Sequence, residues 1–181
     1  MNEHITRVII STLFAVMLAS CSTTPEPRFY TLGALAQTAQ GGEVTMDNKV
    51  LLGISPVHIS PYLDRSEIVT RSGSTQVKLA TYDRWAEPLE DMIASAIAEN
   101  IVRLKPVIRA IARPWPEAEV DYMLAIKIKR FDADDKGSIE LAASWGIIEK
   151  KARKMKTIRE SVIRQQGSGT DFDAIAQAMS K

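Results

Sequence analysis

Three segments in the second half of the chain alternate apolar and polar residues. Apolar side chains occupy every second position over residues 122–128 and again over 139–147, and residues 157–165 form a third, weaker segment. Alternation with a period of two is typical of a half-buried β-strand. The polar stretch 132–137 turns the chain between the first two segments. The pattern therefore predicts an antiparallel meander of three strands.

Shorter strands are predicted earlier in the chain, where Gly and Pro mark the turns. Residues 49–54 are mostly apolar and run into Pro56, which predicts a strand broken or kinked at the proline. Residues 67–71 and 75–80 flank Gly73 and are typical of a hairpin. The other predicted elements are a first strand at 28–35, loops at 36–48 and 58–64, a short strand at 107–111 and a rigid turn at 114–116.

A long helix is predicted to start between Asp83 and Pro88 and to end at Pro106. Its apolar residues recur at spacings of three and four, namely Leu89, Ile93, Ile97, Ile101 and Leu104. Asp171 is a suitable N-cap for a second helix that begins with Phe172, Ile175, Ala176 and Met179. With only about three turns, this helix must dock on the sheet to be stable, or else the natural chain continues further. We therefore expect a single α/β (α+β) domain in two layers, with a mixed, mostly antiparallel sheet and two helices packed on one face.

The first twenty residues have the pattern of a secretory signal. Arg7 precedes an uncharged, mainly apolar run from Val8 to Leu18, which as a helix spans roughly 16 Å and is too short for a hydrocarbon core of about 30 Å. The following Leu18-Ala19-Ser20-Cys21 resembles the lipobox of bacterial lipoproteins, in which the cysteine thiol takes a diacylglyceryl group. We expect residues 1–20 to be a lipoprotein signal peptide, 21–27 a lipidated tether and 28–181 the folded domain.

Cys21 is thus the predicted lipid attachment site. A buried N-terminal helix and a buried free thiol are the alternatives, but the Pro/Ser/Thr-rich residues 22–27 offer the thiol no apolar surroundings. Two or three acyl chains are enough for stable anchoring without a membrane span. By resemblance to lipoprotein sorting, Ser22 in place of Asp after the cysteine implies the outer membrane, with the domain on the periplasmic face.

Composition and charge narrow the classes of function further. The 181 residues are 45% apolar and 25% charged, and 23 Lys+Arg against 22 Asp+Glu leave a net charge of +1. Such a chain is neither a disordered tail nor a nucleic-acid binder, which would need long-range attraction to phosphates. The single cysteine excludes a disulfide framework and a four-thiolate metal site, and two histidines leave little for a histidine-rich metal site.

The search for catalytic motifs finds none of the common nucleophile elbows or phosphate-binding loops. His58 could act as a general base, but no nucleophile accompanies it, and a solvated loop histidine is the simpler interpretation. Asp132, Asp134, Asp135 and Glu140 lack the spacing of a calcium-binding loop and are better explained as an acidic hairpin turn. We therefore predict no catalytic residue, cofactor or metal site.

Two groups of residues are candidates for binding. Five cations lie in seven residues at the tip between two meander strands, where they could contact anionic head groups or an acidic partner, or simply form a solvated turn: Lys150, Lys151, Arg153, Lys154 and Lys156. Two stretches mix aromatic or apolar bulk with Arg, a composition enriched at interface hot spots. Their partner-binding candidates are Tyr62, Leu63, Arg65, Arg84 and Trp85, although Trp85 could equally be a core residue.

These stretches carry a resemblance to a known family. In order, the blocks are Phe29-Tyr30-Thr31-Leu32, Ser60-Pro61-Tyr62-Leu63-Asp64-Arg65, Ile68-Val69-Thr70-Arg71, and Asp83-Arg84-Trp85-Ala86-Glu87-Pro88-Leu89 continuing to Glu99-Asn100. Together they resemble the ABC-type transport auxiliary lipoproteins, the PqiC (YmbA) family. The resemblance implies an outer-membrane-anchored, non-catalytic dock for an MCE-type (PqiB-like) periplasm-spanning protein, in a system that moves lipid and maintains the envelope, and a ring-forming homo-oligomer.

Two features depart from the family pattern, namely a short final helix and the basic tip in place of a Gly/Asp-rich turn. Two other functions are compatible with most of these sequence features. One is a periplasmic lipoprotein that scaffolds or regulates an enzyme of envelope biogenesis. The other is an envelope hydrolase with His58 or the acidic turn as its base.

Overall fold

The computed structural model describes residues 25–33, 50–114 and 120–181 of the chain. The predicted signal peptide, Cys21, the loop at 36–48, and Trp115 and Pro116 of the predicted turn lie outside the described residues. The elements in chain order are β1 (Arg28–Tyr30), β2 (Val50–Ile54), β3 (His58–Ile59), β4 (Glu67–Ser72), β5 (Gln76–Trp85), α2 (Leu89–Leu104), β6 (Ile108–Ile111), β7 (Tyr122–Asp134), β8 (Ser138–Glu149), β9 (Lys154–Gln166) and α3 (Phe172–Met179).

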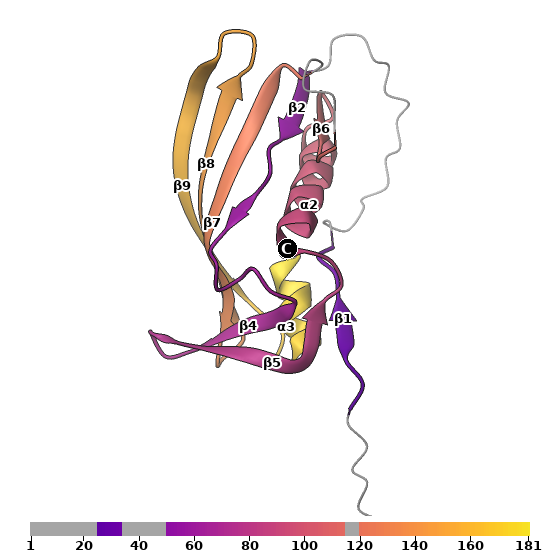
Figure 1. Ribbon diagram of the computed structural model, residues 1–181, viewed down its shortest axis with the longest axis vertical. Coiled ribbons are helices and arrows are strands. Elements are labelled where there is room, and N and C mark those ends of the chain that lie inside the picture. The colour runs from indigo at the N-terminus through magenta and orange to yellow at the C-terminus, as the bar shows by residue number, and fades with distance from the viewer. Residues whose placement is uncertain (1–24, 34–49, 115–119) are drawn as a thin grey trace, which may run out of the picture.

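The strands form one mixed sheet organised around β7 (Figure 1). One edge of β7 pairs in succession with β2, β3 and β4, all parallel to it, because Pro56 and the loop after β3 interrupt this part of the chain twice. Its other edge pairs with β8, which pairs with β9. The long ladders β7–β8 and β8–β9 are antiparallel, and the parallel pairings are short, so the predicted fold class is confirmed.

The meander of β7, β8 and β9 is longer than its alternation predicted. The prediction that the chain turns from Asp132 is wrong, because β7 continues to Asp134 and the turn follows it. A register shift between Ile128 and Arg130 changes which residues face the core, so that Phe131, Asp132 and Ala133 are all buried. The simple period-two pattern ends at this bulge.

Other predicted boundaries change as well. The first strand does not extend over 28–35, because β1 ends at Tyr30. The second arm of the hairpin does not end at Ala80 but continues as β5 through Trp85, where it pairs with β1. His58 is not in a loop, because it begins the two-residue strand β3. The last strand begins at Lys154, so part of the predicted basic tip belongs to β9.

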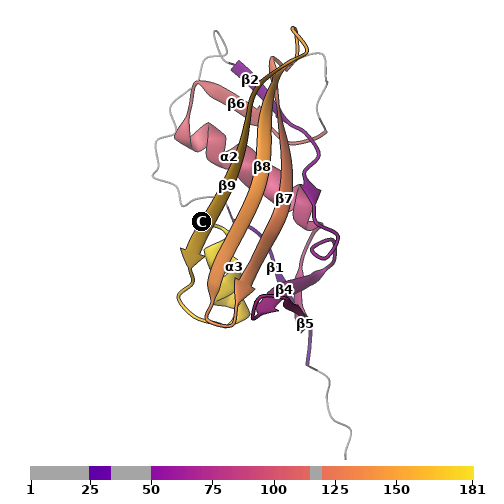
Figure 2. The same cartoon turned by 90° about the vertical axis from the view of Figure 1, so that its left-hand side faces the viewer.

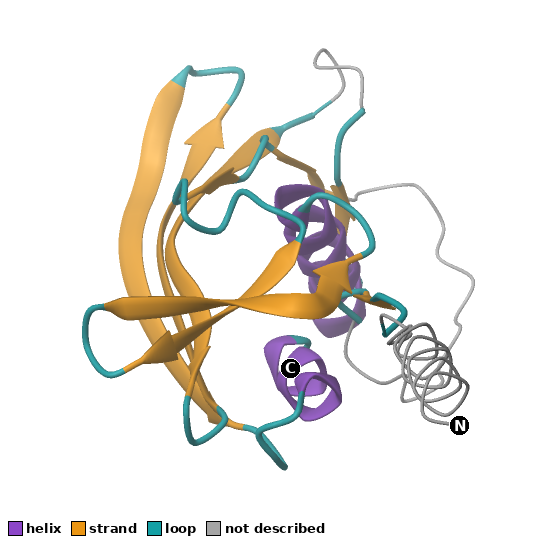
Figure 3. Cartoon of the chain, turned by 60° about the horizontal axis from the view of Figure 1, so that its bottom comes forward, coloured by secondary structure: helices purple, strands orange, loops and turns teal. Residues whose placement is uncertain are grey.

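Both helices lie on the inner side of the curved sheet (Figures 2 and 3). The helix α2 buries Leu89, Met92, Ile93, Ala94 and Ala98, whereas Leu104, predicted for the same stripe, is 65% exposed. The Asp171 side chain accepts a hydrogen bond from the Ala174 backbone N–H, which confirms it as the N-cap of α3. In the described parts of the chain, no helix has the length and apolar content needed to cross a membrane.

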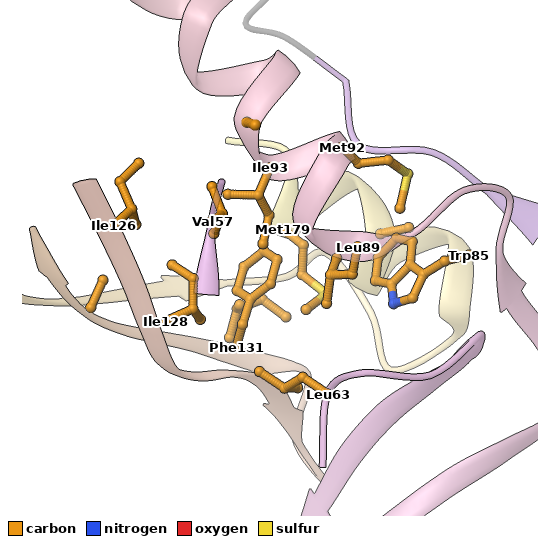
Figure 4. Close-up of a cluster of buried hydrophobic side chains, with 14 of the residues drawn as sticks. Val57, Leu63, Trp85, Leu89, Met92, Ile93, Ile126, Ile128, Phe131 and Met179 are labelled. Carbon is orange, nitrogen blue, oxygen red and sulfur yellow. The ribbon is translucent and has the colours of Figure 1, made fainter. Parts of the chain in front are cut away.

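The core lies between the two helices and the inner face of the sheet (Figure 4). Side chains from α2, α3, β7 and the loop after β3 meet there, among them Leu63, Leu89, Ile93, Phe131 and Met179. The cluster continues along α2 only in part, because Ile97 and Ile101 are no more than half-buried. Because the core covers the C-terminal half of α2 only in part, space remains beside this half of the helix.

Candidate binding groove and the family signature

An apolar groove of about 340 Å³ lies between α2, α3 and the inner face of β7–β9. We call it the apolar groove. Its walls include Ile93 and Ile97 of α2, Ile128 of β7, Trp145 of β8 and Ile163 of β9. Two small side chains, Ala96 on α2 and Ala143 on β8, also line it. Because neither fills the space opposite it, the helix and sheet stand apart here.

Few polar atoms reach the wall of the apolar groove, and one of them is already paired. The Trp145 indole Nε1–H donates a hydrogen bond to Ser161 Oγ at 3.1 Å, across the β8–β9 ladder. Asn100 of α2 lies at the same groove and has an interaction of its own. The groove is therefore suited to an apolar ligand, because a polar one would find few open donors or acceptors.

The block Ser60–Arg65, which we call the signature loop, is fixed to the sheet by specific hydrogen bonds. The Ser60 N–H donates to the Ile128 carbonyl oxygen at 3.0 Å, and its Oγ donates to the Lys129 carbonyl oxygen at 2.9 Å. Arg65 Nε donates to the Tyr62 carbonyl oxygen at 2.8 Å, inside the loop. Leu63 points into the core and is 2% exposed. The loop is thus held to the sheet at Ser60 and to the core at Leu63, and Arg65 bridges within it.

A buried carboxylate, Asp132 of β7, collects the polar side chains beneath the signature loop. It has no exposed surface and accepts hydrogen bonds from the Tyr62 hydroxyl at 2.8 Å and from Arg71 Nη2 at 2.8 Å. Arg130 Nε donates to its other oxygen at 3.0 Å. Arg71 also lies over the Tyr62 ring, 5.9 Å from its centroid. We call Tyr62, Arg71, Arg130 and Asp132 the Asp132 cluster.

The Asp132 cluster keeps its carboxylate ionised. Burial acts to raise the pKa of Asp132, but hydrogen bonds from Arg71, Tyr62 and Arg130 outweigh burial and hold this pKa below its usual range. Burial and the hydrogen bond to Asp132 raise the pKa of Tyr62 to about 12, so its hydroxyl remains a donor at neutral pH. The cluster extends across the sheet, because Arg130 Nη1 and Arg164 Nε contact the two oxygens of Glu140 at 2.9 and 2.8 Å.

A second buried carboxylate joins the first and last signature blocks. Asp83 of β5 is 5% exposed and accepts a hydrogen bond from the Tyr30 hydroxyl of β1 at 2.9 Å. Arg28 lies 2.6 Å from the same oxygen. Burial and the hydrogen bond to Asp83 raise the pKa of Tyr30 to about 12. The Ala86 N–H donates to the Tyr30 carbonyl oxygen, so β1 is fixed to the approach of α2.

The predicted partner-binding residues do not form one surface. Leu63 and Trp85 are 2% and 4% exposed and belong to the core, which for Trp85 is the alternative that the sequence left open. This burial leaves little of either side chain for a partner. Tyr62 is half-buried in the Asp132 cluster. Arg65 is exposed, and Arg84 is half-buried with its Nε lacking a hydrogen-bond partner in this structure. The family blocks thus have a structural role that their composition did not reveal.

The basic tip is exposed at the end of the β8–β9 hairpin. Lys151, Arg153, Lys154 and Lys156 are exposed, and Lys150 is half-buried. Lys156 Nζ lies 2.6 Å from Glu149, so this charge is paired across the hairpin, and Lys150 has an interaction of its own. Arg153 adopts a left-handed backbone conformation with φ of 49°, which places it in the tight turn before β9. The predicted contact of these cations with an anionic surface remains a prediction.

The residues considered for catalysis do not come together. His58 is exposed on β3, whereas Asp132 is buried in its ion cluster. Asp134 accepts hydrogen bonds from the backbone N–H groups of Lys136 and Ser138 and so organises the turn. In the described ranges, no group of three or more His, Cys, Asp and Glu side chains is placed to hold a metal ion. The acidic positions therefore have structural roles, as hydrogen-bond acceptors.

Comparison with known protein families shows to which family the chain belongs. The family model described as the ABC-type transport auxiliary lipoprotein component matches residues 30–181. The chain belongs to this family. The match begins within β1 and covers both buried carboxylates, the signature loop and the apolar groove. The family identifies the chain as a transport auxiliary lipoprotein. A search of curated proteins finds no match.

Solved structures share the fold of this auxiliary lipoprotein at low sequence identity. A crystal structure of a protein described as uncharacterized has 16% identity and a TM-score of 0.71, covering 86% of this chain and 90% of that one. Protein XCC0632 from Xanthomonas campestris, of the family DUF330, has 19% identity and a TM-score of 0.66, with coverage of 84% and 86%. Both similarities support the fold observed here.

Proposed function

We propose that this auxiliary lipoprotein is a non-catalytic subunit that docks an MCE-type, PqiB-like protein of a lipid transport system at the outer membrane, where it supports envelope integrity. Acyl chains on Cys21 hold it on the periplasmic face, and several copies form a ring around the conduit. The observation that carries the proposal is the family match over residues 30–181, which includes all of the signature except Phe29. The lipobox-like sequence before Cys21 supports the anchor.

We propose that the partner docks at the end of the domain nearest the tether. Phe29 on β1 is 64% exposed and lies directly opposite Arg84 in the β1–β5 register. Trp85 N–H donates to the Ser66 carbonyl oxygen at 2.7 Å, which brings exposed Arg65 and its loop to the same end of β5. An exposed aromatic ring near two arginines has the composition of an interface centre.

Co-purification after crosslinking in intact cells tests this proposal. Tagged full-length protein, extracted from membranes with detergent, should recover an MCE-domain protein that mass spectrometry identifies. Replacing Phe29 by Ala together with Arg65→Glu should reduce the recovered partner strongly, because both changes alter exposed side chains and leave the core intact. Lys127→Glu, an exposed change on β7, is the matched control. Failure of the wild-type protein to recover any MCE-domain protein would remove the proposed partner.

A further inference from the structure

The apolar groove is too large to be a packing defect. Folded proteins contain few voids larger than a water molecule, whereas ligand sites measure about 300–1,000 Å³. The groove, at about 340 Å³, lies within the second range. It is bounded by both helices and three strands, so its shape depends on the whole domain and not on one mobile side chain.

The groove opens beside the edge strand β9. Ile163 lines it and is nevertheless 56% exposed, so apolar surface continues from the interior to solvent. The neighbouring Val162 is 59% exposed but does not line the groove, because successive strand residues face opposite sides of a sheet. A continuous apolar path from solvent suits a flexible hydrocarbon chain that enters from one end.

A cation lies next to this opening. Arg159 is on the same face of β9 as Ser161 and Ile163 and stands directly opposite Trp145, which lines the groove. It is exposed, and its side chain makes no hydrogen bond or ion pair with another described residue. The acidic neighbour Glu160 faces the other side of the sheet and pairs with Lys129. Arg159 is therefore free to bind an anion, and its planar guanidinium suits phosphate oxygens.

From these observations we infer that the apolar groove binds one acyl chain of a phospholipid, with the phosphate of the head group at Arg159. Apolar walls exclude a polar ligand, and two cations, Arg159 beside the groove and Lys181 among its lining residues, favour an amphipathic anion over a neutral hydrocarbon. This inference deepens the proposed function and relies on it for the source of the lipid. The auxiliary subunit would then hold transported lipid itself, in addition to docking the conduit.

Photo-crosslinking in cells tests the inference on the full-length protein. A benzophenone amino acid replaces Ile163 in one variant and Val162 in the other, and the cells are grown with radioactive phosphate. Illumination should attach phosphate-labelled lipid at position 163 several times more strongly than at position 162. The protein's own acyl anchor contains no phosphate, so it cannot produce this label. Equal labelling at both positions, or none at position 163, would overturn the inference.

Two further changes separate binding in the groove from simple closeness to a membrane. Ala96→Phe should fill the groove from α2 and abolish the adduct at position 163, while circular dichroism checks that the fold is kept. Arg159→Glu should weaken labelling roughly five- to ten-fold, since each cation near an anionic lipid contributes about a five-fold preference. Lys127→Glu should leave labelling unchanged. Labelling that survives both groove changes would contradict a phospholipid in the groove.

The same experiment distinguishes failure of this inference from failure of the proposed function. Repeated in cells that lack MCE-type proteins, it should still give phosphate-labelled adducts at position 163, because envelope phospholipid remains available. Adducts without any recovered MCE partner would support lipid binding and remove only the proposed docking role. A recovered partner without adducts would keep the docking role and remove the lipid site.

Discussion

The Tyr62 hydroxyl donates a 2.8 Å hydrogen bond to Oδ2 of Asp132, which lies 70 residues further along the chain. This contact joins the signature loop to the longest parallel-paired strand of the sheet. It also places an aromatic side chain over a carboxylate that two arginines already contact. The signature that identifies the family therefore stabilises the fold around Asp132, and its effects on stability can be separated from its effects on binding.

Tyr62→Phe should destabilise the protein by about 1–3 kcal/mol, because it leaves one oxygen of a buried carboxylate with fewer donors. Chemical denaturation followed by fluorescence measures the free energy of unfolding. Tyr82→Phe is the matched control, since no hydrogen bond involves the Tyr82 hydroxyl in the described structure. Equal effects of the two changes would show that the contact with Asp132 contributes nothing specific.

Asp132→Asn should destabilise the protein by roughly 3–5 kcal/mol at neutral pH, because it leaves two arginines without their shared counter-charge. The difference from wild type should shrink as the pH falls. The pKa of Asp132 is lowered in the folded state, so its contribution is full above the unfolded pKa of about 3.9 and is lost toward the lower folded pKa.

Thermal unfolding at a series of acidic pH values checks this dependence. The melting temperatures of wild type and Asp132→Asn should differ fully above about pH 4 and approach each other as the pH falls below it, toward the lowered folded pKa. Asp64→Asn, an exposed change in the same loop, should follow the wild-type curve throughout. A constant difference between wild type and Asp132→Asn at every pH would show that the carboxylate's charge does not produce the stabilisation.

Leu63→Ala should destabilise the domain by about 2–5 kcal/mol, as expected for a large side chain removed from a packed core. Asp64→Ala, the next residue and exposed, should leave the free energy of unfolding nearly unchanged. Denaturant unfolding of the two variants measures the contrast. A small effect of Leu63→Ala would mean that the signature loop is not anchored in the core.

Asp171→Ala should cost about 0.5–2 kcal/mol, because it removes the side-chain cap of α3. Since α3 forms one wall of the apolar groove, local opening should appear first there. Hydrogen exchange of the α3 amides measures this opening, and Asp173→Ala, in the first turn but not at the cap, is the control. Unchanged exchange in α3 would contradict a capping role.

The sequence predicts the helices and strands more accurately than it predicts which of their side chains are buried. The β7–β9 meander, the α2 helix and the Asp171 cap all follow from local periodicity and turn chemistry, which depend on neighbouring residues. The bulge after Ile128 could not be predicted, because it is a shift in the register of β7 against β8, which the alternation of residues along β7 does not encode. It places Asp132 among buried residues, where an acidic stretch had indicated a turn.

At the candidate site, too, the sequence identifies residue types but not which of them are buried. Composition identifies Tyr62, Leu63 and Trp85 as large side chains near arginines, but burial depends on tertiary packing and places two of them in the core. The apolar groove depends on the distance between α2 and the sheet, which no local pattern encodes. One usable signal was the pair of small residues, Ala96 and Ala143, on otherwise bulky apolar faces.

Mass spectrometry of the protein isolated from outer membranes tests the central claim most directly, since docking and lipid transfer both require the anchor at Cys21. We predict a polypeptide that begins at Cys21 and carries a diacylglyceryl group, and an unprocessed precursor in the Cys21→Ser variant. A mature chain without acyl groups, or one that keeps residues 1–20, would contradict an acyl-anchored transport subunit.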